Sequence, residues 1–282
     1  MIFDAFTKKH DYLICVDSDG CVMDTMNCKH FRCFGPCMVD EWDLLPWCAQ
    51  ILARWNEINL FSMTRGINRF KGLALALSEI DVQYTPIRGI EYLRAWVERA
   101  PALSNDGLVQ AISLAKSAEE AEILGKALAW SRAVNQEIVE LPDEVKVPFQ
   151  GAKEGLKAAH AFADVAMVSS ANRDAVEEEW GRFDLLAHTD IVLAQDVGSK
   201  AACIARMLSF GYAPDHVLMI GDAPGDYDAA VKNGVYYYPI LVGKEKESWE
   251  RAIREAFPLL TEGAYAPYGE EQHKLFLENL GG

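Results

Sequence analysis

The sequence has no apolar run close to the ~20 residues that a membrane-spanning helix needs. Glycine and proline are sparse, with 20 and 11 copies in 282 residues, which excludes collagen-like and low-complexity chains. Basic residues are also few: 27 lysines and arginines stand against 42 aspartates and glutamates, giving a net charge of −15. We therefore expect no nucleic-acid partner and no membrane partner.

We also expect no export signal, because charged residues such as Asp4 and Lys8 precede any apolar stretch. The seven cysteines are an odd number, which favours reduced thiols and a cytoplasmic location. The cluster Cys28, Cys33 and Cys37 lacks the Cys-x-x-Cys pairs of a zinc motif. We expect small, partly buried side chains there, and metal binding by this cluster is left open.

Five short apolar runs predict β-strands that are covered on both faces. They are Tyr12–Val16, Val165–Val168, Asp190–Leu193, Val217–Ile220 and Val235–Tyr238. Helical segments separate the last four, at Arg173–Trp180, Lys200–Phe210 and Gly225–Lys232. This alternation predicts an α/β fold with a Rossmann-like parallel sheet.

The stretch between the first two strands predicts amphipathic helices instead. They are Leu44–Asn56, Ile67–Leu77, Ile90–Val97 and Ala118–Val139. We therefore predict a discontinuous core domain, 1–24 and 150–282, with an all-helical domain inserted at 25–149. Two more helices are expected near the C-terminus, at Glu245–Phe257 and Glu270–Leu280, and their role stays open.

Acidic residues follow two of the predicted strands. Asp17 and Asp19 come directly after the first strand and, as alternate residues of an extended segment, point the same way. Asp222 ends the fourth strand, and Asp226 lies near the start of the next helix. Carboxylates at strand ends suit a Mg²⁺ site. In isolation, each piece is also compatible with a plain turn or a helix N-cap.

The other two strand ends carry Ser169 with Ser170, and Lys200. A serine there can donate a hydrogen bond to a phosphoryl oxygen, and Lys200 can place a positive charge beside it. The alternatives are a helix-capping serine and a solvated lysine.

Four polar signals follow four strands in order, and together they resemble the haloacid dehalogenase-like (HAD) superfamily of hydrolases. The motifs are DSDGCVMDT, the strand ending at Ser169, Lys200, and GDAPGD. The resemblance covers roughly residues 10–24 and 150–240. It implies a phosphatase of the HAD fold, with residues 25–149 as its C1 helical cap domain. Many relatives have Pro after the motif lysine, where this chain has Ala201.

The resemblance also implies roles for these residues. Asp17 would be the nucleophile that forms an aspartyl-phosphate, and Asp19 the general acid and base. Mg²⁺ would bind the Asp17 and Asp222 carboxylates and the Asp19 carbonyl, with Asp226 supporting the site. Dehalogenases of the family lack the second aspartate. The expected activity is therefore hydrolysis of a small cytoplasmic phosphorylated metabolite.

Two other functions remain open at this point: a phosphomutase or phosphotransferase with the same residues, and a non-catalytic phosphate-binding protein. Within the predicted cap, Arg65 and Arg69 lie four residues apart in the most basic stretch, so on one helix they would share a face. We expect that face to bind an anionic substrate, the alternative being a solvated helix surface. Neither the substrate nor the oligomeric state can be predicted.

Overall fold

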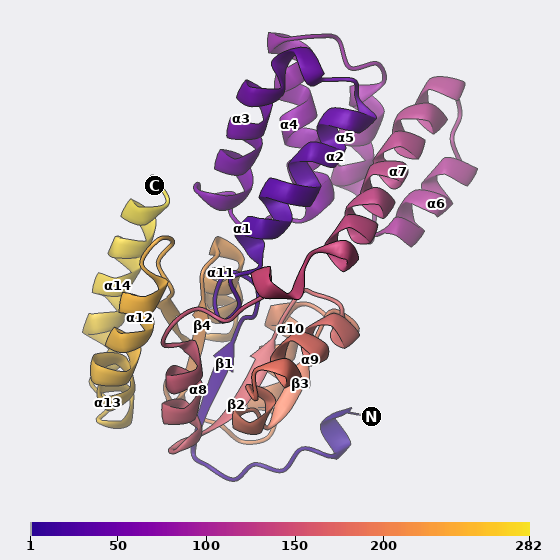
Figure 1. Cartoon of the computed structure of the whole chain (residues 1–282). Helices are drawn as coiled ribbons and strands as arrows, with labels where there is room; N and C mark the ends of the chain where they lie inside the picture. The colour runs from indigo at the N-terminus through magenta and orange to yellow at the C-terminus, as the bar shows by residue number, and fades with distance from the viewer. Residues whose placement is uncertain (1) are drawn as a thin grey trace. The chain divides into compact units, whose positions relative to one another are not determined.

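A computed structural model describes residues 2–282, which divide into two compact units (Figure 1). The core unit contains residues 2–26 and 143–282, and the helical unit contains Asn27–Pro142. The predicted domain boundaries, 24/25 and 149/150, lie two and seven residues from these divisions.

A five-stranded, fully parallel sheet forms the centre of the core unit. Its strands are β1 (Tyr12–Val16), β2 (Ala163–Val168), β3 (Ile191–Leu193), β4 (Val217–Gly221) and β5 (Tyr236–Pro239). Their order across the sheet is β3-β2-β1-β4-β5. The α/β prediction is confirmed, and each predicted strand matches an observed one to within two residues.

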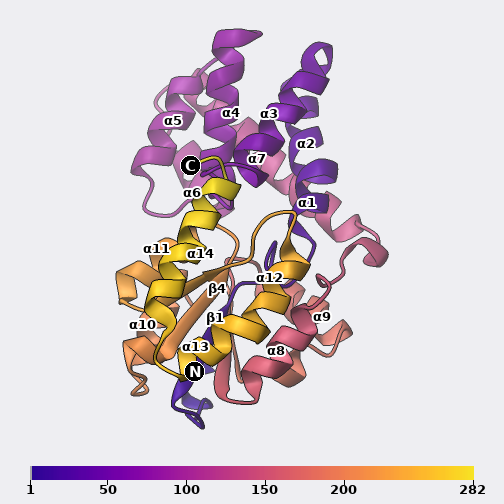
Figure 2. The ribbon, with the colours of Figure 1, turned by 90° about the vertical axis from the view of Figure 1, so that its left-hand side faces the viewer.

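Helices cover both faces of this sheet. They are α8 (Ala152–His160), α9 (Arg173–Arg182), α10 (Lys200–Leu208), α11 (Pro224–Asn233), α12 (Glu245–Arg251), α13 (Phe257–Thr261) and α14 (Tyr265–Asn279). Alternate residues of β1 point to opposite faces, so Ile14 belongs to the hydrophobic cluster that includes residues of α8, α9, α12 and α13, whereas Leu13 belongs to the cluster that includes residues of α10 and α11. Figure 2 shows α12, α13 and α14 together on one side of the core unit, and α14 packs beside β5.

The helical unit has no strand among its described residues. Its helices are α1 (Met26–Lys29, which begins at the last residue of the core unit), α2 (Gly35–Glu41), α3 (Cys48–Leu60), α4 (Arg69–Gln83), α5 (Ile90–Arg99), α6 (Asn105–Ser113) and α7 (Ala118–Glu140). The buried rings of Trp55 and Trp130, 6.0 Å apart, lie in its core. Across residues 2–282, no helix is both long enough and apolar enough to cross a bilayer.

Candidate active site

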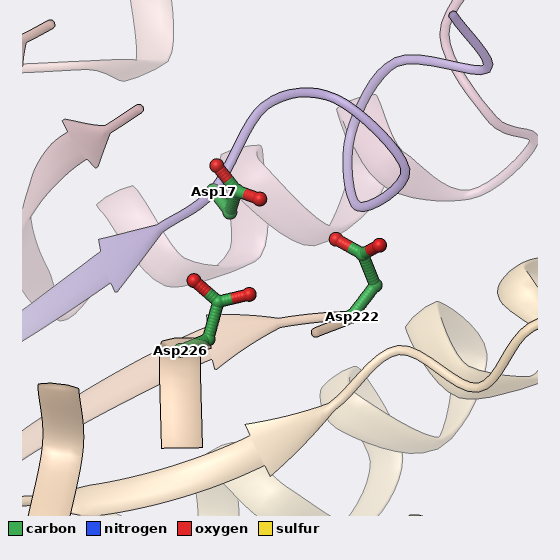
Figure 3. A group of neighbouring side chains, drawn as sticks. All are labelled: Asp17, Asp222 and Asp226. Carbon is green, nitrogen blue, oxygen red and sulfur yellow. The ribbon is translucent and has the colours of Figure 1, made fainter. Parts of the chain in front are cut away.

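Three buried aspartates meet at the carboxyl edge of the sheet (Figure 3). Asp17 follows β1, and its backbone N–H donates to the Ile220 carbonyl of the neighbouring strand at 3.0 Å. Asp222 follows β4, and Asp226 lies in the first turn of α11. One carboxylate oxygen from each lies within 4.8 Å of the others. A set of hard oxygen donors this close could hold a divalent cation.

Lys200 brings a positive charge into this group. It is the first residue of α10, whose N-cap Ser199 accepts a hydrogen bond from the Ala202 N–H. The helix therefore begins at Lys200 although Ala201, not Pro, follows it. The Lys200 Nζ lies 2.9 Å from Asp17 Oδ1 and 2.5 Å from Asp226 Oδ1. The solvated-lysine alternative is wrong, because the side chain is 15% exposed and paired with two acids.

The charges of the site affect one another strongly. Burial raises the pKa of Asp17 well above its ordinary value, the charges of Asp226 and Asp222 add to this, and Lys200 opposes it. Burial alone would lower the pKa of Lys200, but the two neighbouring carboxylates outweigh it and raise that pKa. The two carboxylates therefore stabilise the charged form of Lys200. With all three acids ionised, the group holds three carboxylates and one ammonium, and a divalent cation would favour this ionised state.

Asp226 is held on both of its oxygens. Its Oδ1 accepts a hydrogen bond from the Lys200 ammonium, and its Oδ2 accepts one from the Ala223 N–H at 3.1 Å. Gly221 allows this packing, because a Cβ there would collide with the Asp226 carboxyl group. The arrangement gives Asp226 the means to orient Lys200.

Asp19 lies two residues after Asp17 and is half-buried. The Thr25 hydroxyl donates to its Oδ1 at 2.5 Å. Gly20, with a φ of 86°, turns the chain directly after it. Thr25 is the last residue of the first motif, but nothing in its spacing pointed to this contact with Asp19.

Ser169 follows β2 at the same edge, since Val16 of β1 pairs with Met167 of β2. It is buried, and its Oγ accepts a hydrogen bond from the Ala171 N–H at 3.1 Å. Ser170 is exposed. The side chain that caps α9 is that of Asn172, so neither serine has the capping role considered as the alternative.

The prediction that Arg65 and Arg69 share one face of a helix is wrong, because Arg65 lies outside the helix. Helix α4 begins only at Arg69, because Gly66, with a φ of 69°, and the Asn68 cap precede it. The Arg65 guanidinium is buried and donates to the Leu60 carbonyl at 2.7 Å. Arg69 instead contacts α7, where its Nη1 donates to Ser131 Oγ and Asn135 Oδ1 at 3.1 and 2.6 Å.

The cysteine cluster does not assemble a metal site within residues 2–282. In that range, only one group of three Asp, Glu, His or Cys side chains lies close enough together to hold a metal ion. It is the group of Asp17, Asp222 and Asp226. His30, which lies among these cysteines, uses Nδ1 to accept a hydrogen bond from the Trp55 indole at 3.1 Å. All seven cysteines are free, and Cys33 is fully buried.

Two buried tryptophans contact the loop after β1, and nothing in the sequence pattern indicated them. The Trp180 indole N–H donates to Ser18 Oγ at 2.9 Å. The Trp249 indole N–H donates to the Cys21 carbonyl at 3.0 Å. Both contacts join residues more than 160 positions apart in the chain, so no local motif could reveal them.

Comparison with known families agrees with this geometry. The profile of the family described as haloacid dehalogenase-like hydrolase matches residues 98–239, half of the chain. The chain belongs to this family. Ser169, Lys200, Asp222 and Asp226 of this haloacid dehalogenase-like hydrolase lie within the matched span, whereas Asp17 and Asp19 lie before it.

Several solved structures show similarity to this hydrolase. A haloacid dehalogenase-like family hydrolase from Xanthomonas campestris is 14% identical, with a TM-score of 0.47 and coverage of 91% of this chain and 97% of that one. A predicted phosphoglycolate phosphatase from Haemophilus somnus is also 14% identical, with a TM-score of 0.47 and coverage of 81% and 84%. At this similarity neither indicates a substrate. A search of curated proteins finds no match.

Proposed function

We propose that this chain is a Mg²⁺-dependent phosphomonoester hydrolase that acts on a small phosphorylated metabolite of the cytoplasm. One observation carries the proposal: the Asp17 carboxylate lies 2.9 Å from the Lys200 ammonium at the carboxyl edge of a parallel sheet. A nucleophile beside a fixed cation suits attack on an anionic phosphoryl group. The family assignment supports a hydrolase.

The donor set also fits a magnesium ion, because Asp17 and Asp222 offer buried carboxylate oxygens close together. These two side chains, with the Asp19 carbonyl, would hold the ion. Asp226 is the less suitable ligand, since both of its oxygens already accept hydrogen bonds. When bound, Mg²⁺ supplies positive charge that lets an anionic nucleophile approach an anionic phosphate.

The protein's residues then divide the reaction into two displacements. An Asp17 oxygen bonds to phosphorus, and the ester oxygen leaves with a proton from Asp19. Water then attacks the phosphorus of the aspartyl-phosphate and gives a proton back to Asp19. Inorganic phosphate leaves, and Asp17 is restored. Lys200 and the Ser169 hydroxyl interact with the phosphoryl oxygens throughout.

The test is release of phosphate from p-nitrophenyl phosphate by the purified protein. We expect release with Mg²⁺, none with a chelator, and a loss of at least about 1000-fold in Asp17→Asn. The fold of the variant is checked by circular dichroism. Hydrolysis that survives either chelation or the substitution contradicts the proposal. Transfer of phosphate to a sugar acceptor without release of free phosphate would identify the phosphotransferase alternative.

We further propose that Arg69 binds an anionic group of the natural substrate. Within residues 2–282 its hydrogen-bond acceptors are neutral: the Ser131 hydroxyl and carbonyl and the Asn135 side chain. The Arg69 side chain is half-buried, and burial lowers the pKa of its guanidinium. A partly buried cation whose described acceptors are all neutral could accommodate an anionic group.

Arg69→Ala should therefore raise KM for the natural substrate about 10-fold or more while changing kcat less. Arg94, exposed on α5 of the same unit, offers a matched control, and Arg94→Ala should leave both constants unchanged. A KM that stays constant in Arg69→Ala contradicts this role.

A further inference from the structure

We infer that Trp180 and Trp249 are positioning residues, which hold the loop after β1 so that Asp17 and Asp19 point into the site. The inference rests on the proposed function for the roles of the two aspartates. The loop itself and its contacts lie wholly within the core unit.

The loop, residues 18–23, curls tightly around the carbonyl oxygen of Ser18. This oxygen accepts hydrogen bonds from the backbone N–H groups of Val22 and Met23, both at 2.9 Å. Gly20 adopts a φ of 86° and donates its N–H to the Met23 carbonyl at 2.9 Å. Asp17 and Asp19 flank Ser18 at the centre of the curl, so the conformation of the curl sets where both residues lie.

The two indoles reach this curl from different helices. Ser18 is fully buried, and its Oγ accepts from Trp180 of α9 at 2.9 Å. The Cys21 carbonyl, at the end of the curl, accepts from Trp249 of α12 at 3.0 Å. An indole has a single hydrogen-bond donor. In Trp180 and Trp249 this donor binds the loop after β1, at Ser18 and at Cys21.

The two indole rings are also enclosed by close packing. Trp180 and Trp249 are fully buried in the same hydrophobic cluster, on one face of the sheet. Helix α8 presents Gly155 to the Trp249 ring, at a distance that leaves no room for a Cβ. A side chain locked in this way gives its hydrogen bond a fixed direction, which is what precise placement of catalytic groups requires.

A small displacement of reacting groups is costly, since a shift of about 1 Å can lower the rate about 100-fold. Trp180→Phe and Trp249→Phe keep most of the apolar volume and remove the donor. We expect each to lower kcat about 10- to 100-fold with KM changed less than about threefold. In a double-mutant cycle, Ser18→Ala should add little to Trp180→Phe, because both remove the same contact.

Tyr212→Phe is the matched control. It removes a buried hydrogen bond of the same unit, from the Tyr212 hydroxyl to Asp164 of β2 at 2.5 Å, near the amino edge of the sheet. It should lower the melting temperature as the tryptophan variants do, yet leave kcat within about threefold. Tryptophan variants that keep kcat within the same range at the same stability loss overturn the inference.

Amide hydrogen exchange provides a readout independent of catalysis. Exchange in residues 18–23 should rise about 10-fold or more in either tryptophan variant and stay unchanged there in Tyr212→Phe. Unchanged exchange in this segment overturns the inference, even if the protein hydrolyses phosphate esters. A wild-type protein without hydrolase activity contradicts the proposed function, while the exchange experiment still decides the role of the indoles.

Discussion

Asp222 and Asp226 are both buried acids near Asp17, but their contacts differ. Asp226 receives the Lys200 ammonium on one oxygen and the Ala223 N–H on the other. An asparagine there cannot satisfy both donors, because its NH₂ group must face one of them. The proposed metal contact, in contrast, belongs to Asp222.

Asp226→Asn should therefore lower kcat about 100-fold with little change in the Mg²⁺ concentration for half-maximal activity. Asp222→Asn should instead raise that concentration about 10-fold or more. Magnesium titrations of both variants check this. An equal shift in the two would make Asp226 a direct ligand.

At the level of single residues, position after a strand was the informative signal. Asp17, Ser169 and Asp222 could be located because the carboxyl ends of parallel strands meet at one edge. Arg65 was misplaced because the periodic pattern does not show that Gly66 turns the chain before α4. The contacts of the two indoles depend on tertiary packing between distant segments, which residue spacing does not encode.

At the level of elements, helix α8 shows the limits of periodicity. It is nine residues long, lies between two predicted segments, and was not itself predicted. Its function in the fold is nonetheless specific, because Gly155 brings the helix against the Trp249 ring. The long helix α7, with 23 residues, and the strands were predicted, so α8 was missed because it is short and not because its apolar face is weak.

Gly155→Ala should destabilise the protein by about 1–3 kcal/mol through overpacking against Trp249. The accompanying shift of the indole should also lower kcat. Gly125→Ala in α7 is the control, since no atom lies within 4 Å of its added Cβ. That change should be neutral or stabilise by up to about 1 kcal/mol. Urea unfolding of both variants compares them, and equal effects would contradict the packing argument.

For the whole molecule, the division into two compact units predicts unfolding that is not two-state. The proposed metal site lies entirely in the core unit. Mg²⁺ at about 100 times its Kd should therefore raise the core transition by roughly 5–10 °C and leave that of the helical unit unchanged.

Differential scanning calorimetry with and without Mg²⁺ checks this. Phe70→Ala, in the buried core of the helical unit, identifies which transition belongs to that unit. Equal shifts of both transitions by Mg²⁺ would show that the units unfold as one. The sequence predicted the parallel sheet and a helical insertion. It could not predict how stability is divided between the units, which depends on packing within each.

The hydrogen bond from Trp249 to Cys21 also has a consequence during synthesis. Its donor follows its acceptor by 228 residues in the chain. At roughly 5–20 residues per second, translation separates the two by about 10–50 seconds. A nascent chain thus carries Asp17 and Asp19 long before the indole that secures their loop has been made. The loop of this hydrolase is therefore secured at Cys21 only after Trp249 has been made.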